Sequence, residues 1–241
     1  MIAFLTSSPC IYGAPRAILN PENSFLYNLF SCLPPNPRCL FICSGPDTPH
    51  LTDRFAGEMK AAFEEAGMVF SDFRILDRRT DKNAQLMIWQ SDFIILAGGH
   101  VPTQNAYFQE IGLKELLRNY QGVVMGISAG TMNAAERVYV QPEEEGESAA
   151  DFVRFLPGLG ITKVNILPHY QQVKDDVLDG LRLYEDITFD DSYGECFFVF
   201  VDGTYLMIED GRTILYGEAY CLRDAVMEKI SESGDIVILE E

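Results

Sequence analysis

The sequence is poor in positive charge, in histidine and in long apolar runs. Its 18 Lys and Arg residues stand against 36 Asp and Glu residues, which gives a formal net charge of −18 at pH 7. A negative charge of this size repels phosphate backbones and anionic membranes, so we expect neither nucleic acid nor membrane as a partner. No apolar run reaches membrane-spanning length, and residues 1–8 lack the basic start of a signal peptide. We therefore expect a cytoplasmic protein.

The cysteines show no pattern typical of a metal site. None of the six is spaced Cys-x-x-Cys, and most lie in apolar runs, where a free thiol behaves as a small hydrophobic side chain. Zinc needs a larger set of ligands than any neighbouring pair of these residues offers. We expect reduced thiols, no metal and no organic cofactor. The cysteines are Cys10, Cys32, Cys39, Cys43, Cys196 and Cys221.

The chain alternates between short β-rich apolar runs and helical patterns. This order predicts one α/β domain over residues 1–241, with a doubly wound, mainly parallel sheet and helices on both of its faces. The expected strands are 2–6, 39–43, 73–76, 93–97, 123–127 and 163–167. The expected helices are 23–33, 51–66, 81–89, 105–120 and 174–184. Ligands of such sheets bind beyond the carboxyl ends of the strands.

The last quarter of the chain changes to an antiparallel pattern. Strands are expected at 197–201, 204–208 and 213–216, and the Asp-Gly pairs at 202–203 and 210–211 between them are signals of hairpin turns. A helix is expected at 222–230 and an edge strand at 235–239. The domain should therefore end in an antiparallel β-hairpin extension.

The strongest local motif is Gly-Ile-Ser-Ala-Gly at 126–130. It follows a β-type run and precedes a helical pattern, which is the context of a nucleophile elbow. Small neighbours permit the strained turn that such a serine adopts. Ser128 would stand at the strand tip, with the amide of Ala129 facing any negative charge beside it.

A serine nucleophile needs a base, and the chain has only three histidines. His50 lies in a polar loop, which favours a solvated residue. His100 follows the Gly98-Gly99 strand end and suits contact with substrate or backbone as well as proton transfer. His169 follows an apolar strand and Pro168, after the nucleophile in the chain, and is the best candidate.

Three segments together carry a resemblance to a known family. Gly98-Gly99, the pentapeptide at 126–130 and Leu-Pro-His-Tyr at 167–170 resemble, in this order and spacing, the peptidase E and cyanophycinase family of serine peptidases. The resemblance implies a flavodoxin-like fold related to class I glutamine amidotransferases. It also implies hydrolysis of small aspartyl peptides or aspartyl isopeptides. Ser128 would form an acyl-enzyme, His169 would move the proton, and the amides of Gly99 and Ala129 would form the oxyanion hole.

The acid of the triad is expected from the same resemblance. Cyanophycinase-like relatives place a glutamate before the late hairpin, and Glu195 in Tyr-Gly-Glu at 193–195 matches that position. A second possibility is the acidic loop after the nucleophile helix, at Glu143 to Glu145. Asp191 is a third.

The substrate contacts depart from the family pattern. No arginine follows His169 closely, and the continuation after Gly99 is unusual, so aspartyl specificity is in doubt. The polar residues best placed to bind a substrate instead are His100, Thr103, Gln104 and Lys174.

Other functions remain open at this point. A silent or substrate-shifted binding protein on the same fold would keep Ser128 and His169. An α/β-hydrolase esterase shares the elbow, but its histidine lies near the C-terminus. A glutamine amidotransferase needs cysteine at the elbow. An edge strand or an exposed apolar helix face would allow a homodimer, although the sequence demonstrates none.

Overall fold

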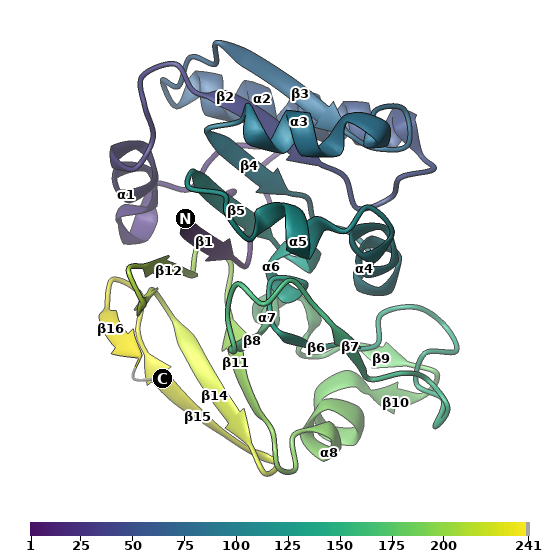
Figure 1. Ribbon diagram of the computed structural model, residues 1–241. Coiled ribbons are helices and arrows are strands. Elements are labelled where there is room, and N and C mark those ends of the chain that lie inside the picture. The colour runs from purple at the N-terminus through teal and green to yellow at the C-terminus, as the bar shows by residue number, and fades with distance from the viewer. Residues whose placement is uncertain (240–241) are drawn as a thin grey trace.

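A computed structural model describes residues 1–239, and an eight-stranded sheet forms its centre (Figure 1). The strand order is β16-β13-β12-β1-β5-β4-β2-β3. The strands from β1 to β3 in this order are parallel, and β12, β13 and β16 add an antiparallel side. The bounds are β1 (Ile2–Thr6), β2 (Arg38–Ile42), β3 (Asp72–Leu76), β4 (Phe93–Leu96), β5 (Val123–Ile127), β12 (Tyr205–Glu209), β13 (Arg212–Tyr216) and β16 (Ile236–Leu239). The predicted mainly parallel α/β fold with an antiparallel C-terminal extension is confirmed.

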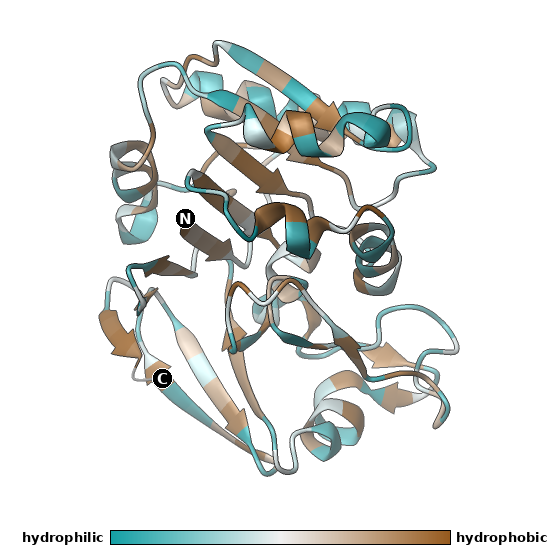
Figure 2. Ribbon diagram, viewed as in Figure 1, coloured by the Kyte–Doolittle hydropathy of each residue, from teal (hydrophilic) through white to brown (hydrophobic). Residues whose placement is uncertain are grey.

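Helices cover both faces of the parallel strands. Alternate residues of β2 point to opposite sides, so Phe41 packs with Phe25 and Phe63, whereas Leu40 packs with Ile88 and Phe108. The central strands β4 and β5 are apolar along their length because both of their faces are covered (Figure 2). The helices on the first face are α1 (Phe25–Ser31) and α2 (Pro49–Glu65); those on the second are α3 (Ala84–Trp89), α4 (Val101–Glu110) and α5 (Leu113–Leu117). Short turns η1 (Glu22–Ser24) and η2 (Asp81–Asn83) lead into α1 and α3.

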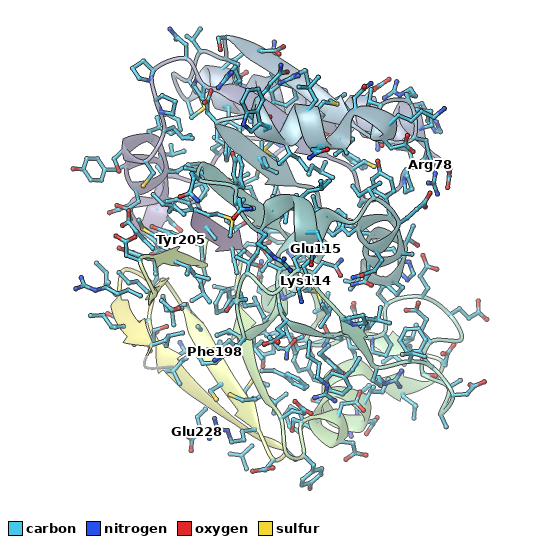
Figure 3. All side chains as sticks on the ribbon, viewed as in Figure 1. Arg78, Lys114, Glu115, Phe198, Tyr205 and Glu228 are labelled. Carbon is cyan, nitrogen blue, oxygen red and sulfur yellow. The ribbon has the colours of Figure 1, made fainter. Side chains whose placement is uncertain are left out.

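The antiparallel side of the sheet is held by an aromatic cluster around Tyr205, which is labelled in Figure 3. Its ring stacks on Tyr216 with centroids 4.8 Å apart and lies 5.2 Å from Phe25 at a steep angle. The buried phenol accepts a hydrogen bond from Asn28 and donates one to the carbonyl of Asn23. These contacts attach α1 and the C-terminal strands to the edge of the parallel core.

A second sheet consists of four strands from the C-terminal half. Its order is β15-β14-β11-β8, and β8 runs parallel to β11. The bounds are β8 (Asn165–Leu167), β11 (Cys196–Phe200), β14 (Ala219–Arg223) and β15 (Val226–Ser231). The helix predicted at 222–230 is therefore wrong. Asp224 and Ala225 both have positive φ, and this tight turn folds β15 back onto β14.

The helix predicted at 174–184 is also wrong. The chain forms one short helix, α7 (Tyr170–Val173), and then the small hairpin of β9 (Val177–Leu178) and β10 (Leu181–Arg182). Asp179 and Gly180 have φ values of 52° and 83°, so an Asp-Gly turn interrupts the helical pattern. The helical segments η3 (Leu183–Thr188) and α8 (Phe189–Asp191) follow.

The two late Asp-Gly pairs have different structures. Asp210-Gly211 forms the predicted hairpin turn between β12 and β13. Asp202-Gly203 does not, because β11 belongs to the four-stranded sheet and β12 to the eight-stranded one. The prediction of a hairpin at 202–203 was therefore wrong, and this segment links the two sheets.

The remaining elements follow β5. Helix α6 (Ala129–Met132) leads to β6 (Arg137–Tyr139), which pairs with β7 (Phe155–Pro157), and the acidic segment lies between these two strands. Among residues 1–239, no helix is both long and apolar enough to cross a membrane.

Candidate active site

Four strand ends carry the residues of the candidate site. Ser128 follows β5, and Gly98-Gly99 lies beyond β4 in the same sheet. His169 and Asp202 follow β8 and β11 of the smaller sheet, which run parallel with Leu167 opposite Val199. Parallel neighbours bring their carboxyl ends to one edge, and here the edges of the two sheets meet.

Ser128 has the backbone conformation of a nucleophile elbow. Its φ and ψ are 49° and −112°, a combination that L-residues rarely adopt. Its amide is held by the carbonyls of Thr6 and Ser7, at 3.2 and 3.1 Å. A Cβ on Gly126 would lie 2.8 Å from the backbone of Thr131, and one on Gly130 would lie 2.3 Å from the carbonyl oxygen of Leu96. Glycine is therefore needed at positions 126 and 130 because a larger residue would collide with the neighbouring backbone.

His169 is paired with Asp202. Its Nδ1 lies 2.7 Å from Oδ1 of Asp202, whose side chain is 5% exposed. His169 also has a positive φ of 61°, so the backbone turns at this residue between the end of β8 and the start of α7. When Nδ1–H donates to a carboxylate, the lone pair of the ring is placed on Nε2, the nitrogen that a general base uses.

Ser128 and His169 line the same cleft. Within residues 1–239 no hydrogen bond joins the Ser128 hydroxyl to the imidazole, and Nε2 has no protein partner. Catalytic hydrogen bonds are often long in the absence of substrate and shorten when it binds.

The Asp202 carboxylate has several donors besides the imidazole. The hydroxyl of Ser7 donates to Oδ1 at 2.8 Å, and the Gln172 amide donates to Oδ2. The Asp202 amide in turn donates to Gln171 at 3.1 Å. Burial raises the pKa of the Asp202 carboxyl, but the bonds from His169, Ser7 and Gln172 outweigh burial and hold this pKa below its ordinary value. The carboxylate is therefore charged beside the imidazole at neutral pH.

The structure brings neither Glu195 nor Asp191 to the imidazole. Glu195 precedes β11, whereas Asp202 follows it, so the two lie about 20 Å apart along an extended strand. The Glu195 carboxylate pairs instead with Arg137. Asp191 accepts hydrogen bonds from the Tyr139 hydroxyl and from Arg154, at 2.7 and 2.9 Å. The expectation that Glu195 or Asp191 orients His169 is thus corrected in favour of Asp202.

The glycine and alanine expected to supply oxyanion-hole amides lie next to Ser128. Gly99 lines the cleft with a φ of 151°, and a Cβ there would lie 2.3 Å from the Ser44 hydroxyl. Ala129 is the first residue of α6, so its amide has no intrahelical acceptor. A Cβ added to the neighbouring Gly98 would lie 3.4 Å from the Cβ of Ser128.

The cleft beside Ser128 is small and mostly apolar. Its volume is about 210 Å³. Among the described residues that line it, the acidic groups are the carboxylates of Glu143 and Asp176, and there is no lysine or arginine. The apolar lining residues are Val101, Met132, Pro142, Pro168, Val173, Val177, Leu178 and Leu183.

The four predicted substrate contacts lie outside this lining. Gln104 is fully buried and donates to the carbonyl of Ala97 at 2.7 Å, so it has a structural role. Lys174 is exposed where α7 ends. His100 contacts Thr103 through Nδ1, at 2.7 Å, and therefore faces its own helix and not the cleft.

His100 also binds the acidic loop between β6 and β7. Its Nε2 lies 2.8 Å from Glu147, whose other oxygen accepts the amides of Glu143 and Glu144 at 2.9 and 3.0 Å. Ligand atoms of His100, Glu144 and Glu147 lie within 4.8 Å of one another, the spacing of a metal site. Glu147 and His100 are already satisfied by these internal bonds, so the group acts as a clamp on the loop. Glu143 reaches the cleft and accepts a hydrogen bond from the Val101 amide at 3.3 Å.

Asp202 is the site residue that sequence reasoning missed. Its Asp-Gly pair resembles a hairpin turn, and that interpretation hid it. The only signal in the sequence is that Asp202 directly follows an apolar run, since the parallel pairing of β11 with the strand before His169 appears only in the fold.

The comparisons with known proteins agree with the fold described above. A crystal structure of a peptidase from an acI-B1 Actinobacterium matches with a TM-score of 0.63 and 15% identity, over 99% of this chain and 96% of that one. A peptidase E protein from Listeria monocytogenes EGD-e matches with a TM-score of 0.60 and 16% identity, over 95% and 98%. These likenesses show the fold.

A search of the curated proteins by sequence finds no match. The sequence model of peptidase family S51 matches residues 22–216, which is most of the chain and includes Ser128, His169 and Asp202. The chain therefore belongs to peptidase family S51, a family of serine peptidases.

Proposed function

We propose that the chain hydrolyses small peptides with Ser128 as nucleophile, His169 as general base and Asp202 as the carboxylate that orients the base. The observation that carries this is the 2.7 Å contact between His169 Nδ1 and a buried Asp202, at the edge of the cleft that Ser128 lines. Membership of family S51 supports the same chemistry.

The proposed reaction uses these three groups in turn. Ser128 Oγ attacks the scissile carbonyl while Nε2 of His169 takes its proton. The imidazolium, stabilised by Asp202, gives this proton to the leaving amine as the C–N bond breaks. Water then attacks the acyl-enzyme with His169 again as base, and this step releases the acid and restores Ser128.

The oxyanion of each tetrahedral intermediate would be bound by backbone amides. Ala129 offers its amide at the start of α6, where the helix dipole also favours negative charge. Gly99 offers the second amide from the turn after β4. Loss of one such donor lowers the rate by about 10²- to 10³-fold in serine hydrolases.

The cleft favours a substrate side chain that is neutral or cationic. An aspartyl carboxylate, which the family resemblance implies, finds no lysine or arginine among the residues that line the cleft. It would instead face Glu143 and Asp176, and like charges in a partly desolvated site repel each other. Apolar walls and a volume of about 210 Å³ fit one small or medium side chain.

A matched set of dipeptides tests this function. Asp-Leu, Ala-Leu and Lys-Leu differ only in the charge and size of the first side chain, and mass spectrometry follows their cleavage. We expect Ala-Leu and Lys-Leu to be cleaved faster than Asp-Leu, and Ser128→Ala to cleave none. Glu143→Gln should reduce the preference for Lys-Leu over Asp-Leu.

The other outcomes are equally informative. Preferential cleavage of Asp-Leu would contradict the proposed substrate class but keep the mechanism. Equal inactivity of the parent and of Ser128→Ala, extended to β-aspartyl isopeptides, would favour the alternative of a catalytically silent binding protein.

A further inference from the structure

Ser7 touches every member of the Ser128, His169 and Asp202 group. It follows β1 directly, between the two sheets, and is fully buried. Its hydroxyl donates to Asp202 Oδ1 at 2.8 Å and accepts the amide of His169 at 2.8 Å. Its carbonyl accepts the amide of Ser128 at 3.1 Å.

The direction of these hydrogen bonds fixes the Ser7 hydroxyl. A serine hydroxyl has one proton, and here the carboxylate takes it, so the oxygen lone pair is left for the His169 amide. Asp202 Oδ1 is also the oxygen that contacts Nδ1 of His169. One side chain therefore positions both the backbone of the histidine and the carboxylate oxygen that the imidazole uses.

The bonds through Ser7 also join the two sheets. Ser128 belongs to the eight-stranded sheet, whereas His169 and Asp202 follow strands of the four-stranded one. Displacement of a catalytic group by about 1 Å can lower a rate 10²-fold. A contact shared by all three residues is well suited to prevent such displacement.

We infer that Ser7 is a positioning residue, which holds the Asp202 carboxylate and the His169 backbone in register with the nucleophile. The inference rests on the proposed function, because it needs Ser128 to react with the help of His169. It assigns Ser7 no contact with substrate.

The test uses a fluorophosphonate probe, which needs no knowledge of the natural substrate. Ser128 Oγ forms a bond to phosphorus, the P–F bond breaks to release fluoride, and His169 takes the serine proton. We expect Ser7→Ala to lower the maximal rate of labelling about ten- to hundredfold, with little change in the probe concentration at half-maximal rate. Ser7→Cys keeps the shape of the side chain with a somewhat larger atom and donates weakly, so it should also be slow.

Ser8→Ala is the matched control. Within the described part of the chain, the Ser8 hydroxyl forms hydrogen bonds only with the backbone of Cys10, at 3.2 and 3.4 Å, so labelling should be unchanged. Thermal unfolding measured in parallel gives the folded fraction of each variant, to which the rates are normalised.

The pH dependence of labelling separates positioning from a loss of stability. Without Ser7 the buried carboxylate loses a neutral donor and depends more on the charged imidazolium, so the midpoint of the pH–rate curve should move to higher pH. Normalised rates and midpoints equal to those of the parent would overturn the inference. If the parent itself is not labelled, the proposed function fails first, and the role of Ser7 fails with it.

Discussion

At the scale of residues, the strongest prediction concerns the effect of the Asp202 side chain on the reaction rate. Asp202→Asn keeps the shape but removes the charge that stabilises imidazolium, and it favours the wrong tautomer of His169. We expect the labelling and peptidase rates to fall on the order of 10³- to 10⁴-fold with the fold retained. Circular dichroism checks the fold, and probe kinetics give the rate.

Glu195→Gln provides the comparison for that experiment. The Glu195 carboxylate pairs with Arg137 at the far end of β11, so its neutralisation should leave the rate within about twofold of the parent. A large loss with Glu195→Gln, together with an active Asp202→Asn, would restore the assignment made from the family resemblance.

The contrast between these two acids shows what the sequence could predict of the site. Ser128 and His169 are identified by local motifs, because the elbow needs small residues at fixed positions and the histidine follows a strand end. The acid has no such local requirement. Its position depends on which strands pair, and the parallel pairing of β8 with β11 is visible only in the fold.

At the scale of elements, the turn from β5 into α6 depends on close backbone contact. Gly130→Ala would place a methyl group 2.3 Å from the carbonyl oxygen of Leu96. We expect a loss of about 1–3 kcal/mol in the free energy of unfolding, measured by urea denaturation, and a slower reaction of Ser128.

Gly57→Ala is the control for that prediction. Gly57 lies inside α2, and nothing lies within 4 Å of a Cβ added there. Alanine should therefore be neutral or stabilise the protein by up to about 1 kcal/mol. Equal effects of the two substitutions would show that the elbow is not constrained as described.

The acidic loop between β6 and β7 should respond to the charge of Glu147. Burial raises the pKa of this carboxyl, but the amides of Glu143 and Glu144 and the pairing with His100 outweigh it, so the pKa lies below its ordinary value. The carboxylate therefore stabilises the loop above the ordinary glutamate range, and this contribution is lost as the pH falls through the lowered value.

Glu147→Gln imitates the protonated state at neutral pH. We expect faster hydrogen exchange at the amides of Glu143 and Glu144 in this variant, measured by mass spectrometry or NMR. Glu145→Gln, at an exposed position in the same loop, should leave these amides unchanged. Unchanged exchange in Glu147→Gln would show that the clamp contributes little.

Buried helices and strands were easier to predict from the sequence than exposed ones. The central parallel strands β4 and β5 are continuous apolar runs, so their positions follow from the sequence. The segments 174–184 and 222–230 do not, because short amphipathic hairpins carry apolar residues at spacings that also suit a helix. In both segments a tight turn with positive φ, at Asp179-Gly180 and at Asp224-Ala225, forms a hairpin in place of the predicted helix.

At the scale of the whole molecule, the site depends on how the two sheets are joined. A buried cluster packs Leu5, Leu206 and Leu215 of the larger sheet against Ile166 and Phe200 of the smaller one. This cluster lies behind the strand ends that carry His169 and Asp202. The core that holds the sheets together therefore also sets the geometry of the site.

Phe200→Ala tests that dependence. Phe200 is fully buried in the shared cluster, so its truncation should cost about 3–5 kcal/mol of unfolding free energy and lower the labelling rate of the folded protein. Val226→Ala, at a position that is 56% exposed, should change neither quantity by much. If Phe200→Ala is destabilised but reacts at the normal rate, the geometry of the site does not depend on the packing between the sheets.

The central claim is that Ser128 is a nucleophile activated by His169 and Asp202. Intact-mass spectrometry of the protein treated with a fluorophosphonate, followed by peptide mapping, measures this most directly. We expect one adduct, on Ser128, that is absent from Ser128→Ala and forms far more slowly in His169→Asn and Asp202→Asn. No adduct on the parent protein, or an adduct that persists in Ser128→Ala, would contradict the claim.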